Sequence, residues 1–305
     1  MARVIQPILL QRKPEWFKIN RQYGEDYLDL KRIVHGRALH TVCEEARCPN
    51  IYECWNQRTA TLMILGDHCT RACRFCNVKW AHSSTLDPDE PRRVAEAVEA
   101  MGLHFAVITS VDRDDLPDGG AHIFAETIRQ IRQRIPDCGI EVLIPDFQGN
   151  WDALREVVEA GPDVIAHNIE TVPRLYRRVQ PWDNYDISLE LFRQVKRMNP
   201  TIITKSGLIV GMGETKEELV EVMRDLRACD VGILTIGQYL PPTPRHYPLD
   251  RYYTLEEFAE LRDIGYQLGF GHVESGPLVR SSYRAAEQVE SYRARMAQSS
   301  AGDVR

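Results

Sequence analysis

The amino-acid sequence predicts an α/β protein built as a partial (β/α)6 barrel of the TIM type, with an extension at each end. Two observations lead to this prediction. From about residue 60 onward, apolar runs of strand length alternate with segments whose apolar residues recur at i, i+3, i+4 and i+7, a pattern typical of a parallel sheet covered by helices. Six such units are present, whereas a closed TIM barrel needs eight, so we expect an open barrel.

Each expected strand is a run of apolar and β-branched residues bounded by polar turn residues. The six runs cover residues 60–66, 104–111, 140–147, 163–170, 202–210 and 233–240. The helix expected after the first strand carries Val98 and Met101 on one face, with Pro91 near its start and Gly102 just past its end. Proline and glycine favour these two positions. The last expected helix covers residues 255–268.

These elements divide the chain into three parts. Residues 1–59 are expected to form an N-terminal extension with its own cysteines, residues 60–270 the barrel, and residues 271–305 a C-terminal extension. From about residue 288 onward the last part is polar and has no pattern that predicts packing. We therefore expect the end of the chain to fray.

Charge and hydropathy exclude some classes of protein. Of the 305 residues, 38 are Lys or Arg and 44 are Asp or Glu, a net charge of −6, which argues against a nucleic-acid-binding surface. No apolar run approaches the length of a membrane span. We therefore expect a cytoplasmic protein without nucleic-acid or membrane partners. In that reducing compartment eight cysteines are not expected to form disulfides, and the isolated Cys138 and Cys229 are interpreted as core thiols.

The residues that could carry chemistry follow the expected strands. In barrels of this kind, active sites lie on loops at the C-terminal ends of the strands. Three cysteines between residues 69 and 76 follow the first strand. Polar or glycine residues that end or follow the later strands are Ser110, residues 112–118, Asn168, Glu170, Gly211, Gly213, Gln238 and Tyr239. We expect all of these residues to share one mouth of the barrel.

Cys69, Cys73 and Cys76 form the strongest signal in the sequence. Thiolates at this Cys-x3-Cys-x2-Cys spacing can bind three irons of a 4Fe–4S cluster and leave the fourth iron without a protein ligand, as an open catalytic metal site does. With Phe75 before the last cysteine, the loop resembles that of the radical SAM superfamily. The resemblance implies that S-adenosylmethionine (SAM) binds the open iron and is split by an electron from the cluster into a 5′-deoxyadenosyl radical.

A zinc site is the alternative interpretation of these three cysteines, because Cys-x2-Cys pairs also bind zinc. A zinc ion needs a fourth ligand, which His68 or His82 would have to supply. The barrel pattern around the cysteines favours the iron–sulfur interpretation.

The resemblance to radical SAM enzymes also implies where SAM lies. The glycine-rich run 207–214 permits close approach of a ligand to the backbone, and in this superfamily the corresponding segment lines the SAM pocket. Its spacing does not match a dinucleotide-binding or phosphate-binding loop, and a plain strand-to-helix turn is the alternative. The expected SAM contacts are Ser110, Asn168, Glu170, Lys205, Gly211, Gly213 and Gln238.

A second set of cysteines, Cys43, Cys48 and Cys54, has a Cys-x4-Cys-x5-Cys spacing. This spacing is too loose for a standard zinc knuckle and acceptable for another iron–sulfur cluster. Structural and electron-transfer clusters normally have four cysteine ligands. Three thiolates therefore indicate a cluster that reacts, or one that takes its fourth ligand from elsewhere in the chain.

Motifs from about residue 14 to residue 286 resemble the lipoyl synthase family. They are Cys43-Glu-Glu-Ala-x-Cys48-Pro-Asn-Ile-x-Glu-Cys54-Trp, Arg113-Asp-Asp-Leu-x-Asp-Gly-Gly-Ala121, Ile144-Pro-Asp-Phe147, Ala166-His-Asn-x-Glu-Thr-Val172, Gln238-Tyr-Leu240 and Gly276-Pro-Leu-Val-Arg-Ser-Ser-Tyr283. The resemblance implies that Ser282 joins the second cysteine set as the fourth cluster ligand. Ser281 is its neighbour, and adjacent side chains of an extended segment point in opposite directions, so we expect only one of the two serines to reach the cluster.

The resemblance also implies a reaction. Saturated C–H bonds are too strong for acid–base catalysis, so a radical from a cofactor has to break them. The enzyme would insert two sulfur atoms, at C6 and C8, into a protein-bound octanoyl chain, with two 4Fe–4S clusters and SAM as cofactors. The second cluster is the expected sulfur donor, and the iron bound to Ser282 is its labile corner because an alkoxide is a harder ligand than a thiolate.

The same resemblance implies the partners. They are octanoylated lipoyl carriers (the glycine cleavage H protein and the E2 subunits of 2-oxoacid dehydrogenases), a reductant such as ferredoxin or flavodoxin, and an iron–sulfur carrier that rebuilds the second cluster.

Two other classes of protein are alternatives on the sequence alone. One is another sulfur-inserting radical SAM enzyme, such as a biotin synthase-like protein, which lacks the run from Cys43 to Cys54, or an RNA methylthiotransferase, which should carry a basic RNA-binding module. The other is a zinc or iron–sulfur module without catalytic activity. A brown anaerobic preparation with about eight irons per chain would exclude zinc.

Overall fold

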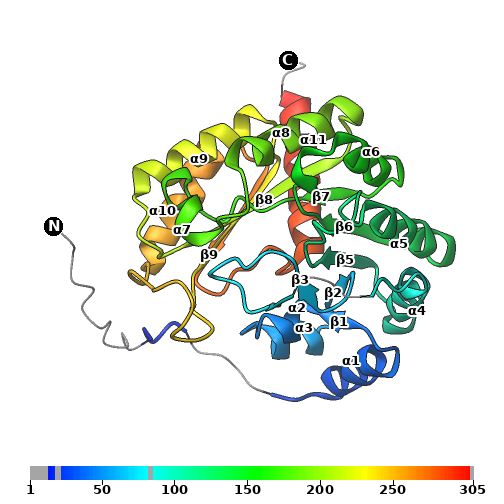
Figure 1. Cartoon of the computed structure of the whole chain (residues 1–305). Helices are drawn as coiled ribbons and strands as arrows, with labels where there is room; N and C mark the ends of the chain where they lie inside the picture. Colours follow the sequence, from blue (N-terminus) through cyan, green and yellow to red (C-terminus); the bar gives the residue numbers. More distant parts are fainter. Residues whose placement is uncertain (1–12, 18–21, 82–84, 303–305) are drawn as a thin grey trace.

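A computed structural model describes residues 13–17, 22–81 and 85–302. Its main feature is an eight-stranded sheet in the order β1-β2-β5-β6-β7-β8-β9-β10, curved into an open barrel (Figure 1). The strands of this sheet are β1 (His40–Thr41), β2 (Thr61–Ile64), β5 (Phe105–Ser110), β6 (Gly139–Leu143), β7 (Val164–Ala166), β8 (Ile203–Val210), β9 (Ile233–Gln238) and β10 (His272–Gly276). All neighbours pair in parallel except β1, which is antiparallel to β2. The predicted fold class is confirmed.

Helices cover the outer face of the sheet, as the alternating pattern predicts (Figure 1). The helices are α1 (Glu25–Gly36), α2 (Val42–Glu45), α3 (Ile51–Asn56), α4 (Glu90–Met101), α5 (Ala121–Arg134), α6 (Trp151–Glu159), α7 (Tyr176–Val179), α8 (Tyr185–Met198), α9 (Lys216–Ala228), α10 (Leu255–Gln267) and α11 (Ala285–Gly302). α4 begins with Pro91 in its first turn and ends at Gly102, whose φ of +64° only glycine adopts easily. Thr215 and Thr254 close capping boxes at the starts of α9 and α10.

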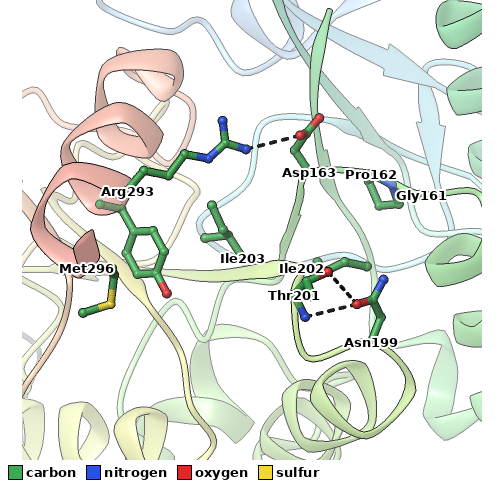
Figure 2. A pocket seen from close by; sticks show the side chains of 10 residues that line it. Gly161, Pro162, Asp163, Asn199, Thr201, Ile202, Ile203, Arg293 and Met296 are labelled. Atoms are coloured by element: carbon green, nitrogen blue, oxygen red, sulfur yellow. Dashed lines mark hydrogen bonds and ion pairs between the residues drawn. The ribbon is translucent and has the colours of Figure 1, made fainter. Parts of the chain in front are cut away.

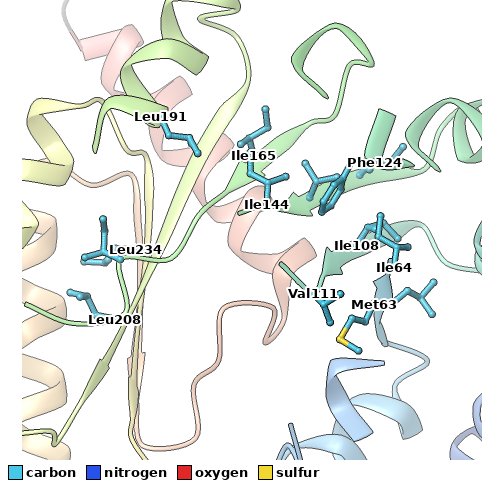
Figure 3. Close-up of a cluster of buried hydrophobic side chains, with 14 of the residues drawn as sticks. Met63, Ile64, Ile108, Val111, Phe124, Ile144, Ile165, Leu191, Leu208 and Leu234 are labelled. Atoms are coloured by element: carbon cyan, nitrogen blue, oxygen red, sulfur yellow. The ribbon is translucent and has the colours of Figure 1, made fainter. Parts of the chain in front are cut away.

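The core lies between the sheet and this layer of helices. Figure 3 shows Ile64, Ile108 and Ile165 on the strands facing Phe124 of α5 and Leu191 of α8, and each of these five side chains is fully buried. Burial of apolar side chains of this size contributes roughly 1.5–3 kcal/mol each. The core therefore fixes the strands, and with them the loops that leave their C-terminal ends.

Two predicted strands are shorter than expected. The run 140–147 leaves the sheet after Leu143, and the run 163–170 leaves it after Ala166. Pro145 cannot donate a ladder hydrogen bond, and Phe147 and Glu170 both have positive φ angles, 47° and 63°. The chain therefore turns early at both places and places polar side chains at the mouth.

The C-terminal region differs most from the expectation. β10 adds a strand parallel to β9, within the segment that the sequence assigned to an extension. It was missed because Val273 is its only strongly apolar residue. The expected fraying from residue 288 is wrong for the start of that stretch, since Gln288 and Val289 of α11 are buried. Residues 303–305 lie outside the described part.

α11 packs across the open centre of the barrel, where Figure 1 shows it in red. It contacts β5, β9 and β10. The ring of Tyr292 fits against Gly232 and Gly271, where an added Cβ would come within 2.6 and 2.4 Å of it. Glycines at these positions thus admit the helix that closes the base of the barrel. No helix in the described residues is long and apolar enough to cross a membrane.

Candidate active site

The loop that carries Cys69, Cys73 and Cys76 is fixed by one arginine between them. Arg71 is buried, and its guanidinium contacts aspartates from three other loops. Nε and Nη2 donate to Asp114 at 2.8 and 2.9 Å, Nη2 donates to Asp146 at 2.6 Å, and Nη1 donates to Asp183 at 2.5 Å. A fourth carboxylate, Asp112, lies 3.8 Å from Nε.

These contacts bring the ends of successive strands together. Asp112 and Asp114 follow β5, Asp146 follows β6, and Asp183 follows α7. The fork of the guanidinium binds several carboxylates at once, which an ammonium cannot do with the same geometry. The expectation of one shared mouth is confirmed for these loops. Arg71 could not be singled out from the sequence, because its partners are 41 to 112 residues away.

The three thiols of this loop, here the SAM set, are free and lie at the mouth. Cys69 donates to Asp112 at 3.3 Å and Cys73 to Asp183 at 3.5 Å. Burial raises the pKa of the Cys76 thiol to about 11 and that of Cys69 and Cys73 well above the usual value. Neutral buried thiols of this kind lose their protons when a metal binds them, so the donor set fits a cluster with three cysteine ligands.

The spacing of the thiols argues against a single zinc ion. A zinc ion with Zn–S bonds of about 2.3 Å holds its sulfur ligands less than about 4 Å apart. Among the described residues, the one group of three ligand atoms within 4.8 Å of one another is His40, Glu45 and Asp67, and no set of three cysteines meets that limit. His68 instead contacts Asp67 at 2.6 Å, and His82 lies outside the described residues.

Three expected SAM contacts offer unused polar atoms at the mouth. The Oδ1 atom of Asn168 is buried without a hydrogen-bond partner in the described residues, while its Nδ2 donates to Glu170 at 3.0 Å. Burial raises the pKa of the Glu170 carboxyl to about 7. Ser110 ends β5 half-buried, and its hydroxyl has no partner among the described residues. Gly207 leaves room beside Asn168, since a Cβ there would lie 2.7 Å from its Oδ1. This cradle fits a small polar ligand group.

The other expected SAM contacts are engaged within the protein. The ammonium of Lys205 is fully buried and donates to both oxygens of Glu141, at 2.8 and 3.0 Å. The amide of Gln238 donates to the carbonyls of Val210 and Arg251 at 2.9 and 3.0 Å. Gly211 has a φ of +104°, and a Cβ there would meet the Gln238 amide at 2.2 Å. We therefore infer structural roles for these residues. Lys205 stabilises the barrel by its ion pair with Glu141, and Gln238 and Gly211 stabilise the glycine loop.

Gly213 has a φ of +100° and no crowding neighbour. Its loop is held by Glu214, whose carboxylate accepts hydrogen bonds from the backbone N–H groups of Gly211 and Met212. The glycine loop at the end of β8 is therefore a tight turn whose first N–H groups are already satisfied.

The role of Lys205 can be tested by removing its charge. Lys205→Met leaves Glu141 buried without a partner, which we expect to lower the free energy of unfolding by about 3–5 kcal/mol. The double variant Lys205→Met/Glu141→Leu should recover most of that loss and keep SAM cleavage. The measurement is anaerobic urea unfolding followed by circular dichroism, beside 5′-deoxyadenosine formation. A stable double variant that no longer cleaves SAM would make Lys205 a ligand contact instead.

The second cysteine set, here the auxiliary set, lies on α2, the turn after it and α3. All three thiols are free. Burial is the main cause of their raised pKa values, about 12 for Cys43, and the neighbouring thiols add to the effect for Cys43 and Cys54. One buried and two half-buried thiols that affect one another electrostatically are the donor set that a second cluster needs.

The C-terminal segment after β10 binds directly to this region. Asn50 donates to the carbonyl of Leu278 at 2.6 Å, and the hydroxyl of Tyr283 donates to Glu53 at 2.9 Å. Ser281 and Ser282 lie between these two contacts, half-buried, in a turn that runs to Arg284. The expectation of an extended segment is therefore wrong here. Because the segment is a turn, opposite directions of adjacent side chains cannot be used to decide which serine reaches the cluster.

Arg280 lies near both the auxiliary set and one expected SAM contact, and the sequence did not single it out. The residue is half-buried. Desolvation lowers the pKa of its guanidinium, while the nearby Cys48 thiol and Glu170 carboxyl act in the opposite direction. Arg280 is thus close both to the auxiliary set and to the SAM contacts. Asn77, which follows Cys76, also donates to the carbonyl of Glu45 on α2 at 2.8 Å, so the helix that carries Cys43 contacts the loop of the SAM set.

A cavity of about 610 Å³ in the described residues lies elsewhere. It lies at the N-terminal ends of β7 and β8, next to α11, and Figure 2 shows Arg293 donating to Asp163 across it. A smaller cavity of about 280 Å³ lies at the mouth, between the loops that follow β5 and β6. Because the SAM set is at the C-terminal ends of the strands, the cavity of about 610 Å³ is not the active site.

The fold and the cysteine loop define a radical SAM enzyme. Residues 63–226 match the family model of the Radical SAM superfamily. Solved structures with the same fold include methylornithine synthase, with a TM-score of 0.53 and 16% identity over 85% of each chain. Another is the [FeFe]-hydrogenase maturase HydG, with a TM-score of 0.55 and 17% identity over 74% of this chain and 53% of that chain.

Sequence relatives identify the family. Residues 6–48 match the N-terminal domain of lipoyl synthase of the Radical SAM family. A curated lipoyl synthase of Rubrobacter xylanophilus is 58% identical over 92% of this chain and 88% of its own length. One of Symbiobacterium thermophilum is 59% identical over 92% of this chain and 87% of its own length. The chain belongs to the lipoyl synthase family, which decides against the biotin synthase-like and RNA methylthiotransferase alternatives.

Proposed function

We propose that this protein inserts sulfur at C6 and C8 of an octanoyl chain carried on a lipoyl carrier protein, which yields the lipoyl group. The observation that carries the proposal is that two free three-cysteine sets lie on segments in contact with each other. Asn77, next to Cys76, donates to the carbonyl of Glu45 on α2 at 2.8 Å. A single set would suffice for SAM cleavage. A second set beside it supports a reaction that also consumes sulfur from a second cluster.

Cys69, Cys73 and Cys76 are the proposed ligands of the 4Fe–4S cluster that, when bound, supplies the electron for SAM cleavage. Arg71 fixes the loop between these ligands, so that their positions depend on four aspartates rather than on the loop alone. Asn168 Oδ1 and the Glu170 carboxylate are proposed to accept hydrogen bonds from SAM, and Ser110 is a third candidate. Gly213 leaves backbone space beside them.

Cys43, Cys48, Cys54 and Ser282 are the proposed ligands of the auxiliary cluster, which would supply the sulfur atoms. The contacts of the C-terminal segment with Asn50 and Glu53 support this assignment, because they hold the serine pair against the helix that carries Cys54. Arg280 is half-buried near Cys48, so its positive charge offsets the negative charge of thiolate ligands there.

The proposed partners follow from this reaction. The substrate carriers are the octanoylated H protein of glycine cleavage and the E2 subunits of 2-oxoacid dehydrogenases. The electron donor is a ferredoxin or flavodoxin, and an iron–sulfur carrier rebuilds the auxiliary cluster after it has given up sulfur. The function is tested by anaerobic incubation with SAM, dithionite and an octanoyl-lysine peptide. The peptide should gain the mass of two sulfur atoms, and an unchanged peptide mass beside normal SAM cleavage would refute the proposal.

Ser282→Cys tests the fourth ligand of the auxiliary cluster. Cysteine is a softer and tighter ligand for iron than serine, so this variant should hold both clusters and cleave SAM but transfer sulfur much more slowly. Ser281→Cys is the matched control and should behave nearly like the parent. The measurement is lipoyl peptide formed per enzyme, with iron content determined in parallel. Impairment of Ser281→Cys alone would move the ligand to Ser281, and two unimpaired variants would exclude a role for either serine.

A further inference from the structure

An exposed group of arginines covers the outer side of the SAM-cysteine loop. We call Arg74, Arg177, Arg178 and Arg245 the arginine patch; all four are exposed. Among the described residues, the guanidinium groups of Arg74, Arg177 and Arg245 have no ion pair or hydrogen bond. That of Arg178 lies over the ring of Tyr247, 5.6 Å from its centroid. Most other arginines in the described part of this acidic protein are paired with carboxylates, so a group of four without a carboxylate partner there needs a reason.

Backbone hydrogen bonds tie this patch to the cysteine loop itself. The N–H of Arg74 donates to the carbonyl of Val179 at 2.7 Å, next to Arg177 and Arg178 on α7. The carbonyl of Arg74 accepts from the N–H of Tyr247 at 2.7 Å. His246, which follows Arg245, contacts the carbonyl of Cys76 through Nε2 at 3.0 Å. The two flanking segments therefore rest directly on the loop between Cys73 and Cys76.

An exposed tryptophan lies next to the patch. Trp182 is 51% exposed, and the following residue, Asp183, turns inward to Arg71 and Cys73. Exposed Asp186 and Asp250 border the same segments, so four arginines against two carboxylates leave an excess of positive charge. Arginine and tryptophan are enriched in the energetic centres of protein interfaces. The composition is that of a docking surface for an acidic protein.

We propose that the arginine patch docks a small acidic one-electron carrier protein, which delivers the electron for SAM cleavage through the Cys73–Cys76 loop. The proposal rests on the proposed function, since only a radical SAM reaction needs this electron. One electron leaves the reduced carrier and enters the cluster held by the loop, and no proton or group is transferred. Electron transfer slows steeply with distance. At the arginine patch, surface segments contact the Cys73–Cys76 loop directly, so a carrier docked there would lie close to the cluster. Charge complementarity then orients the acidic carrier.

Charge reversal at two patch residues tests the docking. Arg177→Glu/Arg245→Glu changes side chains without partners in the described residues and leaves the cysteine loop intact. With reduced flavodoxin as donor, we expect 5′-deoxyadenosine formation to fall about tenfold or more at low salt. The affinity of the anaerobically purified holoprotein for oxidised flavodoxin, measured by calorimetry, should fall by a similar factor. With dithionite as reductant and an octanoyl peptide as substrate, the rate should stay within about twofold of the parent.

The matched control is Lys31→Glu/Arg224→Glu, which changes the net charge by the same amount at exposed positions on α1 and α9. It should keep both the flavodoxin affinity and the flavodoxin-driven rate. Equal effects of the two pairs, or no effect of either, would overturn the proposal. Loss of the dithionite-driven reaction with an octanoylated carrier protein, but not with the peptide, would assign the patch to the substrate protein instead. An inactive parent under dithionite would refute the proposed function rather than the docking site.

Discussion

Replacing Cys69, Cys73 and Cys76 together with alanine should abolish SAM cleavage and remove about half of the bound iron, about four atoms per chain. The three thiols are the SAM set, and among the described residues the carboxylates Asp114, Asp146 and Asp183 around them are engaged with Arg71 and not free to replace them. The auxiliary set belongs to other elements, α2 and α3, so its cluster should be retained. The measurements are iron content after anaerobic reconstitution and 5′-deoxyadenosine formed with dithionite.

The complementary variant replaces Cys43, Cys48 and Cys54. It should also lose about half of the iron, yet it should continue to cleave SAM, because Arg71 and the aspartates still hold the SAM set. No sulfur should reach the octanoyl peptide. Undiminished 5′-deoxyadenosine formation by the first variant, or lipoyl peptide from the second, would contradict the assignment of the two sets.

Arg71→Met should have the next largest effect. It removes the one cation that four aspartates share in a buried position, and removing one partner of a buried ion pair leaves charges that burial strongly disfavours. The loop between Cys69 and Cys73 should then lose its fixed geometry. We expect loss of the SAM-set iron and of SAM cleavage, with the auxiliary iron retained. Arg71→Lys keeps the charge without the fork and should recover only part of the activity.

Arg113→Met is a suitable control for Arg71→Met. Arg113 is also a buried arginine, and it donates to both oxygens of Asp115 at 2.8 Å, but it lies outside the cysteine loop. Its loss should lower stability while the folded fraction keeps about eight irons per chain. Iron content and the electron paramagnetic resonance signal after reduction distinguish the two variants. A full iron content in Arg71→Met would show that the loop does not depend on its aspartates.

The sequence predicted the layered fold well because each strand and helix is a local pattern. The positions of Pro91 and Gly102, for example, mark the ends of α4 by chemistry that acts within a few residues. β10 escaped prediction because its burial comes from neighbours rather than from its own apolar content. In the same way, α11 carries a mostly polar sequence, and its packing against glycines and strands through Val289 and Tyr292 is not visible in an apolar pattern.

The candidate site was predictable only in part, for a related reason. Cysteine spacing is a short-range pattern, so both sets could be proposed without a structure. Whether a polar residue at a strand end is free for a ligand depends on distant partners. Lys205 pairs with Glu141, which is 64 residues away, whereas Asn168 keeps an unpaired oxygen. Arg71 and Arg280 could not be distinguished from surface arginines, because their partners come together only in the folded chain.

The contacts of Asn50 with Leu278 and of Glu53 with Tyr283 have a consequence for biosynthesis. They join residues 228 and 230 positions apart, so on the ribosome the surroundings of Cys54 stay incomplete until almost the whole described chain has emerged. The SAM loop, by contrast, has its aspartate partners once residue 183 is made. An auxiliary site that includes the serine pair is therefore complete only after residues 281 and 282 have been made. A chain cut short before Leu278 would keep the complete set of Arg71 partners and lack the serine pair altogether.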